Sequence, residues 1–167
     1  HQAPVWQVAY RASASRTLAG ETLPYSFFKR LPDDGQRYFA DPFVVHHEGW
    51  HHVFVEELPY ATGRGVISHF VIDRDGVCGQ PRVVLEEPHH LSYPQVFQHG
   101  GQFWMMPEAS NSGRLDLYRA ERFPDRWVHH ARLLDHPVHD ATFFAHDGRL
   151  WIFAGTTVGA ASSWDTL

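Results

Sequence analysis

The sequence lacks several features that would place it in other classes of protein. It has a single cysteine, Cys78, in 167 residues, so no disulfide can form within the chain. We therefore expect a reducing compartment and predict a cytoplasmic location. No apolar run approaches the roughly 20 residues that span a bilayer, and no signal peptide is recognisable. We expect no membrane insertion.

Positive charge is also scarce. The chain has 14 Lys and Arg against 19 Asp and Glu, and its net charge is −5 with histidine neutral. Binding to a phosphate backbone needs a basic surface, so we predict no nucleic-acid partner. Histidine, in contrast, is abundant, with 14 residues. The surface charge should therefore change strongly between about pH 5 and pH 7.

Aromatic residues and turn formers are plentiful. Hydrophobic residues make up 43% of the chain and aromatic residues 14%, which indicates a globular protein. The 13 glycines and 11 prolines are spread along the sequence. Frequent turn formers among aromatic and β-branched residues favour many short strands.

Three segments of the chain align as a repeat. Each has a glycine eight residues after its start, with apolar residues on both sides, and the starts are 52 and then 47 residues apart. A two-residue hairpin turn needs positive φ, which glycine adopts easily, so each segment predicts two antiparallel strands. The segments are Asp41–Glu56, Tyr93–Glu108 and Asp140–Gly155, with turns at Glu48-Gly49, Gly100-Gly101 and Asp147-Gly148.

Two further strands follow the hairpin in the first two repeats. The third strands are predicted at Val66–Ile72 and Leu115–Tyr118, and the fourth at Arg82–Leu85 and Trp127–Leu134. Four strands with a period near fifty residues are typical of a β-propeller. We predict an all-β fold, a partial β-propeller of four-stranded antiparallel blades that is truncated in its third blade. A β-sandwich with coincidental spacing is the alternative.

The repeat also predicts how one domain is divided. Residues 1–36 are expected to form an N-terminal strand and loop, 37–88 blade 1, 89–137 blade 2 and 138–167 the start of blade 3. The strand at Val5–Tyr10 is predicted to close the ring by joining the last blade. Ser162–Leu167 can only begin a third strand of blade 3. Because a closed propeller needs at least four blades, we expect the remaining blades to come from the parent chain or another copy.

Acidic residues occupy equivalent positions in the repeats. In a propeller, the start of the first strand and the end of the second strand converge around one mouth of the central channel. Five of the six residues at these positions are carboxylates, although Asp and Glu total only 19 residues. Scattered acids at solvent-exposed strand ends are the alternative explanation. The six residues are Asp41, Tyr93, Asp140, Glu56, Glu57 and Glu108.

Paired carboxylates around a cleft suit glycoside hydrolysis. One carboxyl group stays protonated as the acid and the other is ionised as the base, with about 6.5–9.5 Å between them in inverting enzymes. Burial and mutual repulsion separate the two pKa values. We predict Asp41 as the base and Glu108 as the acid, with Asp140 tuning or positioning them.

Substrate binding is predicted for Tyr93, Glu56, Glu57 and Trp104. Trp104, Tyr93 and Trp50 could stack on sugar rings, and core packing is the alternative role for each aromatic side chain.

Histidines suggest two other kinds of site. His46 should face His51 across the first hairpin, and such a pair can bind a transition metal. No HExxH motif or Cys/His spacing accompanies the pair, so we predict no functional metal site and no cofactor. His139 beside Asp140 suggests a catalytic dyad, but no serine in a nucleophile elbow accompanies it.

Several stretches resemble known families. The closer resemblance is to the propeller domain of glucosamine inositolphosphorylceramide transferase-like proteins, which in bacteria occurs attached to formyltransferase-like proteins. A more distant resemblance, through Ala40–Phe43 and Pro107-Glu108, is to the five-bladed propellers of arabinanase- and xylosidase-type hydrolases. The stretches that carry the closer resemblance are Tyr38–Phe43, Val84–Pro94, Met106–Ser110, Leu115–Arg119 and Asp140–Phe144.

The resemblance to the hydrolases implies a five-bladed propeller, an Asp base on the first blade and a Glu acid further on. Two departures weaken the transfer of that mechanism. The hydrolases have a pKa-tuning Asp where this chain has Tyr93, and their acid lies on a later blade than Glu108.

Together these observations predict a carbohydrate-active propeller domain, hydrolase-like or transferase-associated, that acts on or binds a glycan or glycoconjugate at the channel mouth. One alternative is a non-catalytic glycan-binding or scaffolding propeller attached to a formyltransferase or glycosyltransferase domain. A propeller that binds only proteins is a third.

Overall fold

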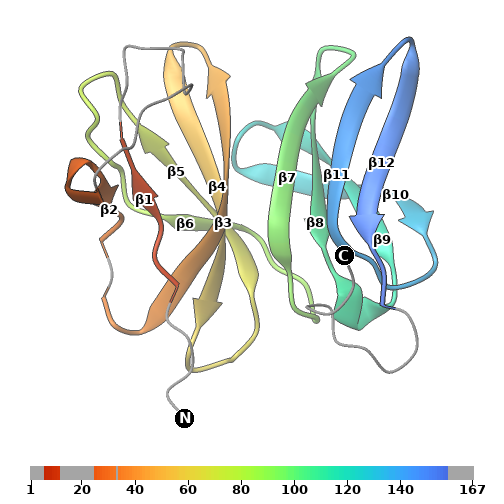
Figure 1. The fold of residues 1–167 in the computed structure, drawn as a ribbon, viewed down its shortest axis with the longest axis horizontal. Coiled ribbons are helices and arrows are strands. Elements are labelled where there is room, and N and C mark those ends of the chain that lie inside the picture. Colours follow the sequence, from red (N-terminus) through yellow and green to blue (C-terminus); the bar gives the residue numbers. More distant parts are fainter. Residues whose placement is uncertain (1–5, 12–24, 33, 158–167) are drawn as a thin grey trace.

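The computed structural model describes residues 6–11, 25–32 and 34–157, and the described chain is built almost entirely of antiparallel strands (Figure 1). Blade 1 has the strand order β3 (Arg37–His47), β4 (Trp50–Pro59), β5 (Val66–Ile72) and β6 (Arg82–Leu85). Blade 2 has the order β7 (Ser92–His99), β8 (Gln102–Glu108), β9 (Leu115–Arg122) and β10 (Arg126–Leu134).

Two smaller sheets flank these blades. β11 (His139–His146) and β12 (Arg149–Gly155) form a hairpin beside blade 2, and β1 (Ala9–Tyr10) pairs with β2 (Lys29–Arg30) beside blade 1. Figure 1 shows the β1–β2 sheet together with blade 1 on one side of the molecule, and blade 2 together with the β11–β12 hairpin on the other. The only helices among the described residues are two short 3₁₀ turns, η1 (Tyr25–Phe27) and η2 (Ser110–Ser112). Neither is long and apolar enough to cross a membrane.

The predicted all-β fold of four-stranded antiparallel blades is confirmed. The strands predicted at Val66–Ile72 and Arg82–Leu85 are β5 and β6 with the same bounds. The third strand of blade 2 continues to Arg122, four residues beyond the prediction, and its fourth strand starts one residue earlier, at Arg126.

The three hairpin turns have the geometry that their glycines predict. In the first turn Glu48 has φ 49° and Gly49 has φ 82°, and His47 pairs with Trp50. Positive φ at both central residues is the type I′ geometry, whose twist matches that of the flanking strands. Both central residues are also positive at Gly100-Gly101 and at Asp147-Gly148. The register therefore places His46 opposite His51, as the sequence predicts.

Each inner strand also contains a β-bulge at the same repeat position. Between Ala40 and Phe43 the strand β3 advances three residues while its partner β4 advances two, and β7 and β11 repeat the shift at 92–95 and 139–142. The first bulged residues, Asp41, Tyr93 and Asp140, have φ of 51°, 42° and 51°. Positive φ is strained for residues with a Cβ, and such bulges re-aim side chains near functional sites.

Hydrophobic clusters join neighbouring units. The largest lies between the two blades, where Phe54 and Ile67 pack with Met105 and Trp127. A second cluster joins Val8 and Leu31 to blade 1, and a third joins blade 2 to the β11–β12 hairpin through residues that include Met106 and Ala141. Because each unit buries apolar surface against its neighbours in chain order, the order of the repeats sets the order of the sheets.

One repeat position shows where this burial stops. Phe54 and Met106 are equivalent, and their side chains are 0% and 1% exposed. The equivalent residue of the third repeat, Phe153, is 60% exposed, and Phe144 and Trp151 beside it are 53% and 42% exposed. No described residue covers this apolar face of the β11–β12 hairpin.

Three sequence predictions remain open. β1 pairs with β2, and Leu31 N–H donates to Val8 O at 2.9 Å, so this segment packs on blade 1. Closure of a ring by residues 5–10 stays a prediction, as does completion by further blades. The predicted beginning of a strand at 162–167 lies outside the described residues.

Candidate functional site

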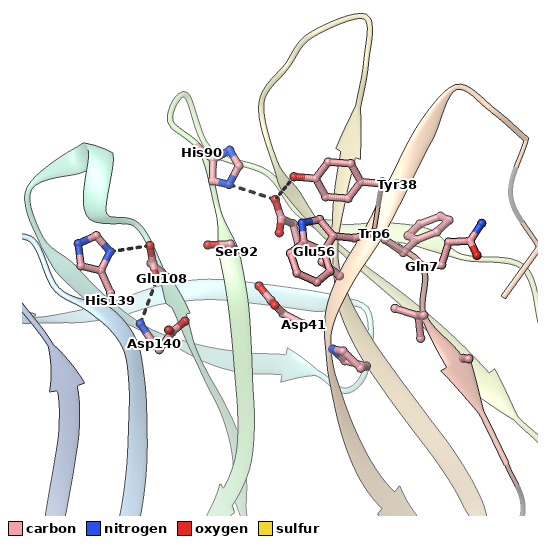
Figure 2. Close-up of a pocket in the computed structure, with 15 residues that line it drawn as sticks. Trp6, Gln7, Tyr38, Asp41, Glu56, His90, Ser92, Glu108, His139 and Asp140 are labelled. Atoms are coloured by element: carbon pink, nitrogen blue, oxygen red, sulfur yellow. Dashed lines mark hydrogen bonds and ion pairs between the residues drawn. The ribbon is translucent and has the colours of Figure 1, made fainter. Parts of the chain in front are cut away.

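A cavity of about 680 Å³ lies where the inner strands begin and the second strands end (Figure 2). Its wall contains four carboxylates and two histidines, together with Trp6, Gln7, Tyr38 and Ser92, and none of the described residues that line it is Lys or Arg. The structure thus brings together four of the acids that the repeat predicts at one mouth. The four carboxylates are Asp41, Glu56, Glu108 and Asp140, and the two histidines are His90 and His139.

Asp41 lies near the middle of this wall, between the groups around Glu56 and Glu108 in Figure 2. Its Oδ2 accepts a hydrogen bond from Tyr93 N–H at 3.1 Å. Burial raises the pKa of Asp41, the charges of Glu56, Asp140 and Glu108 raise it further, and the Tyr93 hydrogen bond opposes the shift. Asp41 therefore holds a proton more readily than an exposed aspartate.

Glu108 is held by three neighbours. Its Oε2 accepts from Asp140 N–H at 2.9 Å, and its Oε1 lies 3.0 Å from Ser110 Oγ and 3.1 Å from His139 Nδ1. A general acid needs a protonated oxygen that faces the ligand, whereas both oxygens of Glu108 accept hydrogen bonds from the protein. The geometry thus favours Glu108 as a fixed acceptor, and its role as the acid stays a prediction.

Asp140 contributes a carboxylate to which no hydrogen bond is recorded from the described residues. Burial and the charge of Glu108 raise its pKa, and His139 opposes the shift. Asp41 and Asp140 occupy equivalent bulge positions, so the bulge delivers one carboxylate to the cavity from blade 1 and one from the third repeat.

The bulges also connect neighbouring repeats through carboxylates. Asp41 accepts from the backbone N–H of Tyr93, and Glu108 accepts from the backbone N–H of Asp140. Each N–H belongs to the positive-φ residue of the next inner strand. Both acids therefore satisfy a bulge N–H as well as lining the cavity.

Glu56 is only 5% exposed and forms a second cluster in the wall, together with His90 and Tyr38. Its Oε1 lies 3.1 Å from His90 Nε2 and 3.5 Å from the Tyr38 hydroxyl. Burial, then the nearby charge of Glu56, raises the pKa of Tyr38 to about 12. Tyr38 therefore keeps its proton near neutral pH and donates to Glu56.

Other predicted site residues lie away from this cavity. Glu57 points to the opposite face of β4, because successive side chains of a strand alternate, and there it pairs with Arg37 and accepts from Ser68 Oγ at 2.6 Å. Trp104 lines a separate apolar cleft of about 260 Å³ between blade 2 and the β11–β12 hairpin. Trp50 is next to the first hairpin turn and 47% exposed.

Tyr93 connects the inner strands and is not part of the cavity wall. Its ring packs edge-on against Phe43 at 4.9 Å between centroids, and its hydroxyl lies 3.1 Å from Thr142 Oγ1. Its backbone reaches the site only through the N–H that Asp41 accepts.

Sequence reasoning missed several residues of the wall. Ser92 directly precedes Tyr93 and Tyr38 lies three residues before Asp41, whereas Trp6 and His90 reach the cavity from segments that the repeat does not cover. His139 was considered only as part of a dyad with Asp140. The loop that carries His90 lies within Val84–Pro94, one of the stretches that carry the family resemblance, but the sequence alone indicated no role for His90 in the cavity.

The predicted histidine pair is present, with the rings of His46 and His51 at 5.1 Å between centroids. Within the described part of the chain, no group of three or more His, Cys, Asp or Glu side chains is arranged to hold a metal ion.

Three curated plant proteins are similar to this chain in sequence. Glucosamine inositolphosphorylceramide transferase 1 of Arabidopsis thaliana is 33% identical over 123 residues, which cover 73% of this chain. The proteins of the same name from the indica and japonica subspecies of Oryza sativa are each 34% identical over 118 residues, or 70% of this chain. The chain spans only 16% of the length of each relative.

A solved structure shares the fold. A family 117 glycoside hydrolase from the marine bacterium Zobellia galactanivorans superposes with a TM-score of 0.56 over 71% of this chain and 48% of its own, at 14% identity. This likeness concerns the fold alone. Residues 30–165 match the family described as glucosamine inositolphosphorylceramide transferase 1, N-terminal, and the chain belongs to that family.

Proposed function

We propose that this chain binds the sugar part of a glycoconjugate in the cavity between the blades. The observation that carries the proposal is the composition of the wall, where four carboxylates stand beside Trp6 and Tyr38 and no Lys or Arg is present among the described lining residues. Carboxylate oxygens accept hydrogen bonds from sugar hydroxyls, and aromatic rings pack against the apolar faces of sugars.

The charge of the wall also indicates which part of a glycoconjugate would enter. Phosphate groups are bound by Arg, Lys and backbone N–H groups, and two of the N–H groups near the wall already donate to Asp41 and Glu108. Like charges repel in a partly buried site. We expect an uncharged or amino-bearing sugar in the cavity and any phosphate outside it.

Two comparisons support a carbohydrate ligand. The relatives are named as glycolipid transferases, and the fold is shared with a glycoside hydrolase. A role for this chain in recognising the glycolipid substrate of a transferase is part of the proposal.

Asp140→Asn is expected to weaken sugar binding about tenfold, since a hydrogen bond to a charged group contributes about 1.5–3 kcal/mol. Titration of glucosamine, N-acetylglucosamine, glucose and myo-inositol, followed by NMR, measures the effect. Asp135→Asn is the matched control, because Asp135 is exposed, pairs with Arg132 and does not line the cavity. Equal affinities in the two variants would contradict the assignment of the cavity.

Hydrolysis is the second candidate function, and the raised pKa values of Asp41 and Asp140 favour it. An aspartic acid that keeps its proton near a sugar can act as a general acid. If the chain hydrolyses glycans, Asp41→Asn and Glu108→Gln should each abolish turnover without unfolding the protein.

A glycan array run beside a hydrolysis screen separates these roles. Binding without turnover supports recognition alone, and turnover that survives both substitutions contradicts the acid and base assignments. A propeller that binds only proteins would give no glycan signal.

A further inference from the structure

His90 reaches the cavity wall from the loop between β6 and β7, and one backbone group fixes how its ring is protonated. Gly65 N–H donates to His90 Nδ1 at 3.0 Å, and Leu91 N–H donates to Gly65 O at 3.0 Å. A ring nitrogen that accepts a hydrogen bond carries no proton, so the proton of the neutral ring is on Nε2. Nε2 is the nitrogen that lies 3.1 Å from Glu56 Oε1.

Glycine at position 65 is required for this contact. A Cβ there would lie 2.4 Å from Leu91 O and 2.8 Å from His90 Cε1, too close for either atom to stay in place. Only glycine lets the loop after β4 approach the loop before β7 so closely. Gly65 therefore holds the His90 ring in one position as well as in one tautomer.

The two oxygens of Glu56 have different surroundings. Both nearby donors, His90 Nε2 and the Tyr38 hydroxyl, lie at Oε1 (Figure 2). Among the described residues, no donor is recorded at Oε2. The side chain lines the cavity although the residue is only 5% exposed. An oxygen that lines a cavity and has no donor from the described residues is free to accept a hydrogen bond from water or from a ligand.

We propose that His90 is a positioning residue that holds Glu56 so that its Oε2 accepts a hydrogen bond from a ligand hydroxyl. This inference rests on the proposed function, because the ligand is the sugar that the cavity would bind. His90 acts through Glu56 and selects ligands that donate hydrogen bonds at this point. The arrangement is a subsite for a hydroxyl or ammonium group. It combines the loops that carry Gly65 and His90 with the strand that carries Glu56, and the repeat pattern does not predict that these parts meet.

His90→Leu is expected to weaken binding of the best sugar of the panel about tenfold, the lower end of the effect of losing a positioning partner. His90→Gln should retain most of the affinity, because one amide can accept from Gly65 and donate to Glu56. His136→Leu is the matched control, since His136 is exposed and does not line the cavity. The Gln variant separates the hydrogen bonds of His90 from its packing.

Long-range ¹H–¹⁵N NMR of the ligand-free protein measures the tautomer directly. We expect the ring proton of His90 on Nε2 and an unprotonated Nδ1, because the backbone N–H of Gly65 donates to Nδ1. A proton on Nδ1 in the wild type, or His90→Leu binding the sugar as tightly as the wild type, would overturn the proposal. If His90 has the expected tautomer but no sugar binds to the wild type, the proposed function fails, and the ligand part of this inference fails with it.

Discussion

Phe54→Ala is expected to lower the free energy of unfolding by about 3–5 kcal/mol, the usual cost of removing a buried phenylalanine ring. The Phe54 side chain is fully buried between the blades, where its ring packs edge-on against Trp127 at 5.7 Å between centroids. Its removal leaves a cavity that β-sheet backbones cannot easily close. Urea unfolding followed by tryptophan fluorescence measures the loss.

The repeat supplies a matched control for this substitution. Phe153 occupies the equivalent position in the third repeat and is 60% exposed. Phe153→Ala removes the same atoms and should change the free energy of unfolding by no more than about 0.5 kcal/mol, as at other surface sites. Similar losses in both variants would show that the face of the β11–β12 hairpin is covered in solution.

Acidification from about pH 6.5 to pH 4 is expected to remove about 2 kcal/mol of stability through two histidines at the interface between blades. His52 Nδ1 and His69 Nε2 lie 3.0 Å apart. Burial lowers the pKa of His69 to about 4 and also lowers that of His52, and each histidine's neighbours include another imidazole that adds to the shift. Solvent access to the ring edges keeps the expected loss below the full value of the shift.

The direction of the effect follows from the lowered pKa values. Well above pH 6.5 both rings are neutral in the folded and the unfolded chain, so the stability is fully present. Below that pH the unfolded chain takes up protons that the folded chain does not, and unfolding becomes easier until His69 also titrates near pH 4. Urea unfolding at several pH values between 7 and 4 measures this slope.

His69→Gln isolates the effect of the pair. Glutamine keeps a hydrogen-bonding group for His52 but does not titrate, so the slope between pH 6.5 and pH 4 should become shallower. His136→Gln, at an exposed position that does not contribute to the shift of either histidine, should leave the slope unchanged. A wild-type slope in His69→Gln would show that other groups cause the acid sensitivity.

The local parts of the fold could be predicted because each depends on a few adjacent residues. Glu48-Gly49 and Asp147-Gly148 set type I′ turns, and the turns fix the register of both hairpins. The bulges were missed, although Pro42 and Pro94 signalled them. Proline cannot donate to a sheet and in strands is found mainly at edges and bulges.

Only the residues of the site that occupy equivalent positions in the repeats could be predicted from the sequence. Asp41, Asp140, Glu56 and Glu108 meet because they occupy equivalent positions at strand ends. Glu57 is not at the mouth, because Glu56 and Glu57 are adjacent in β4 and adjacent side chains of a strand point to opposite faces.

The contacts of His90 could not be predicted. They depend on how closely two loops from different parts of blade 1 approach each other, and no local pattern encodes that distance.

The extra residue in the β3 bulge also decides which side chains of β3 face the wall. β3 uses one residue more than β4 between Ala40 and Phe43. Deleting Pro42 would restore simple alternation and turn the preceding residues to the opposite side, exchanging the places of Tyr38 and Phe39. A one-residue deletion would thus rebuild the wall by turning its side chains, while Pro42 is the one side chain lost from it. Deleting or inserting two residues would keep each side chain on its face of the sheet and would shift only its position along the strand. Evolution in this segment should therefore tolerate substitutions better than odd-numbered changes in length.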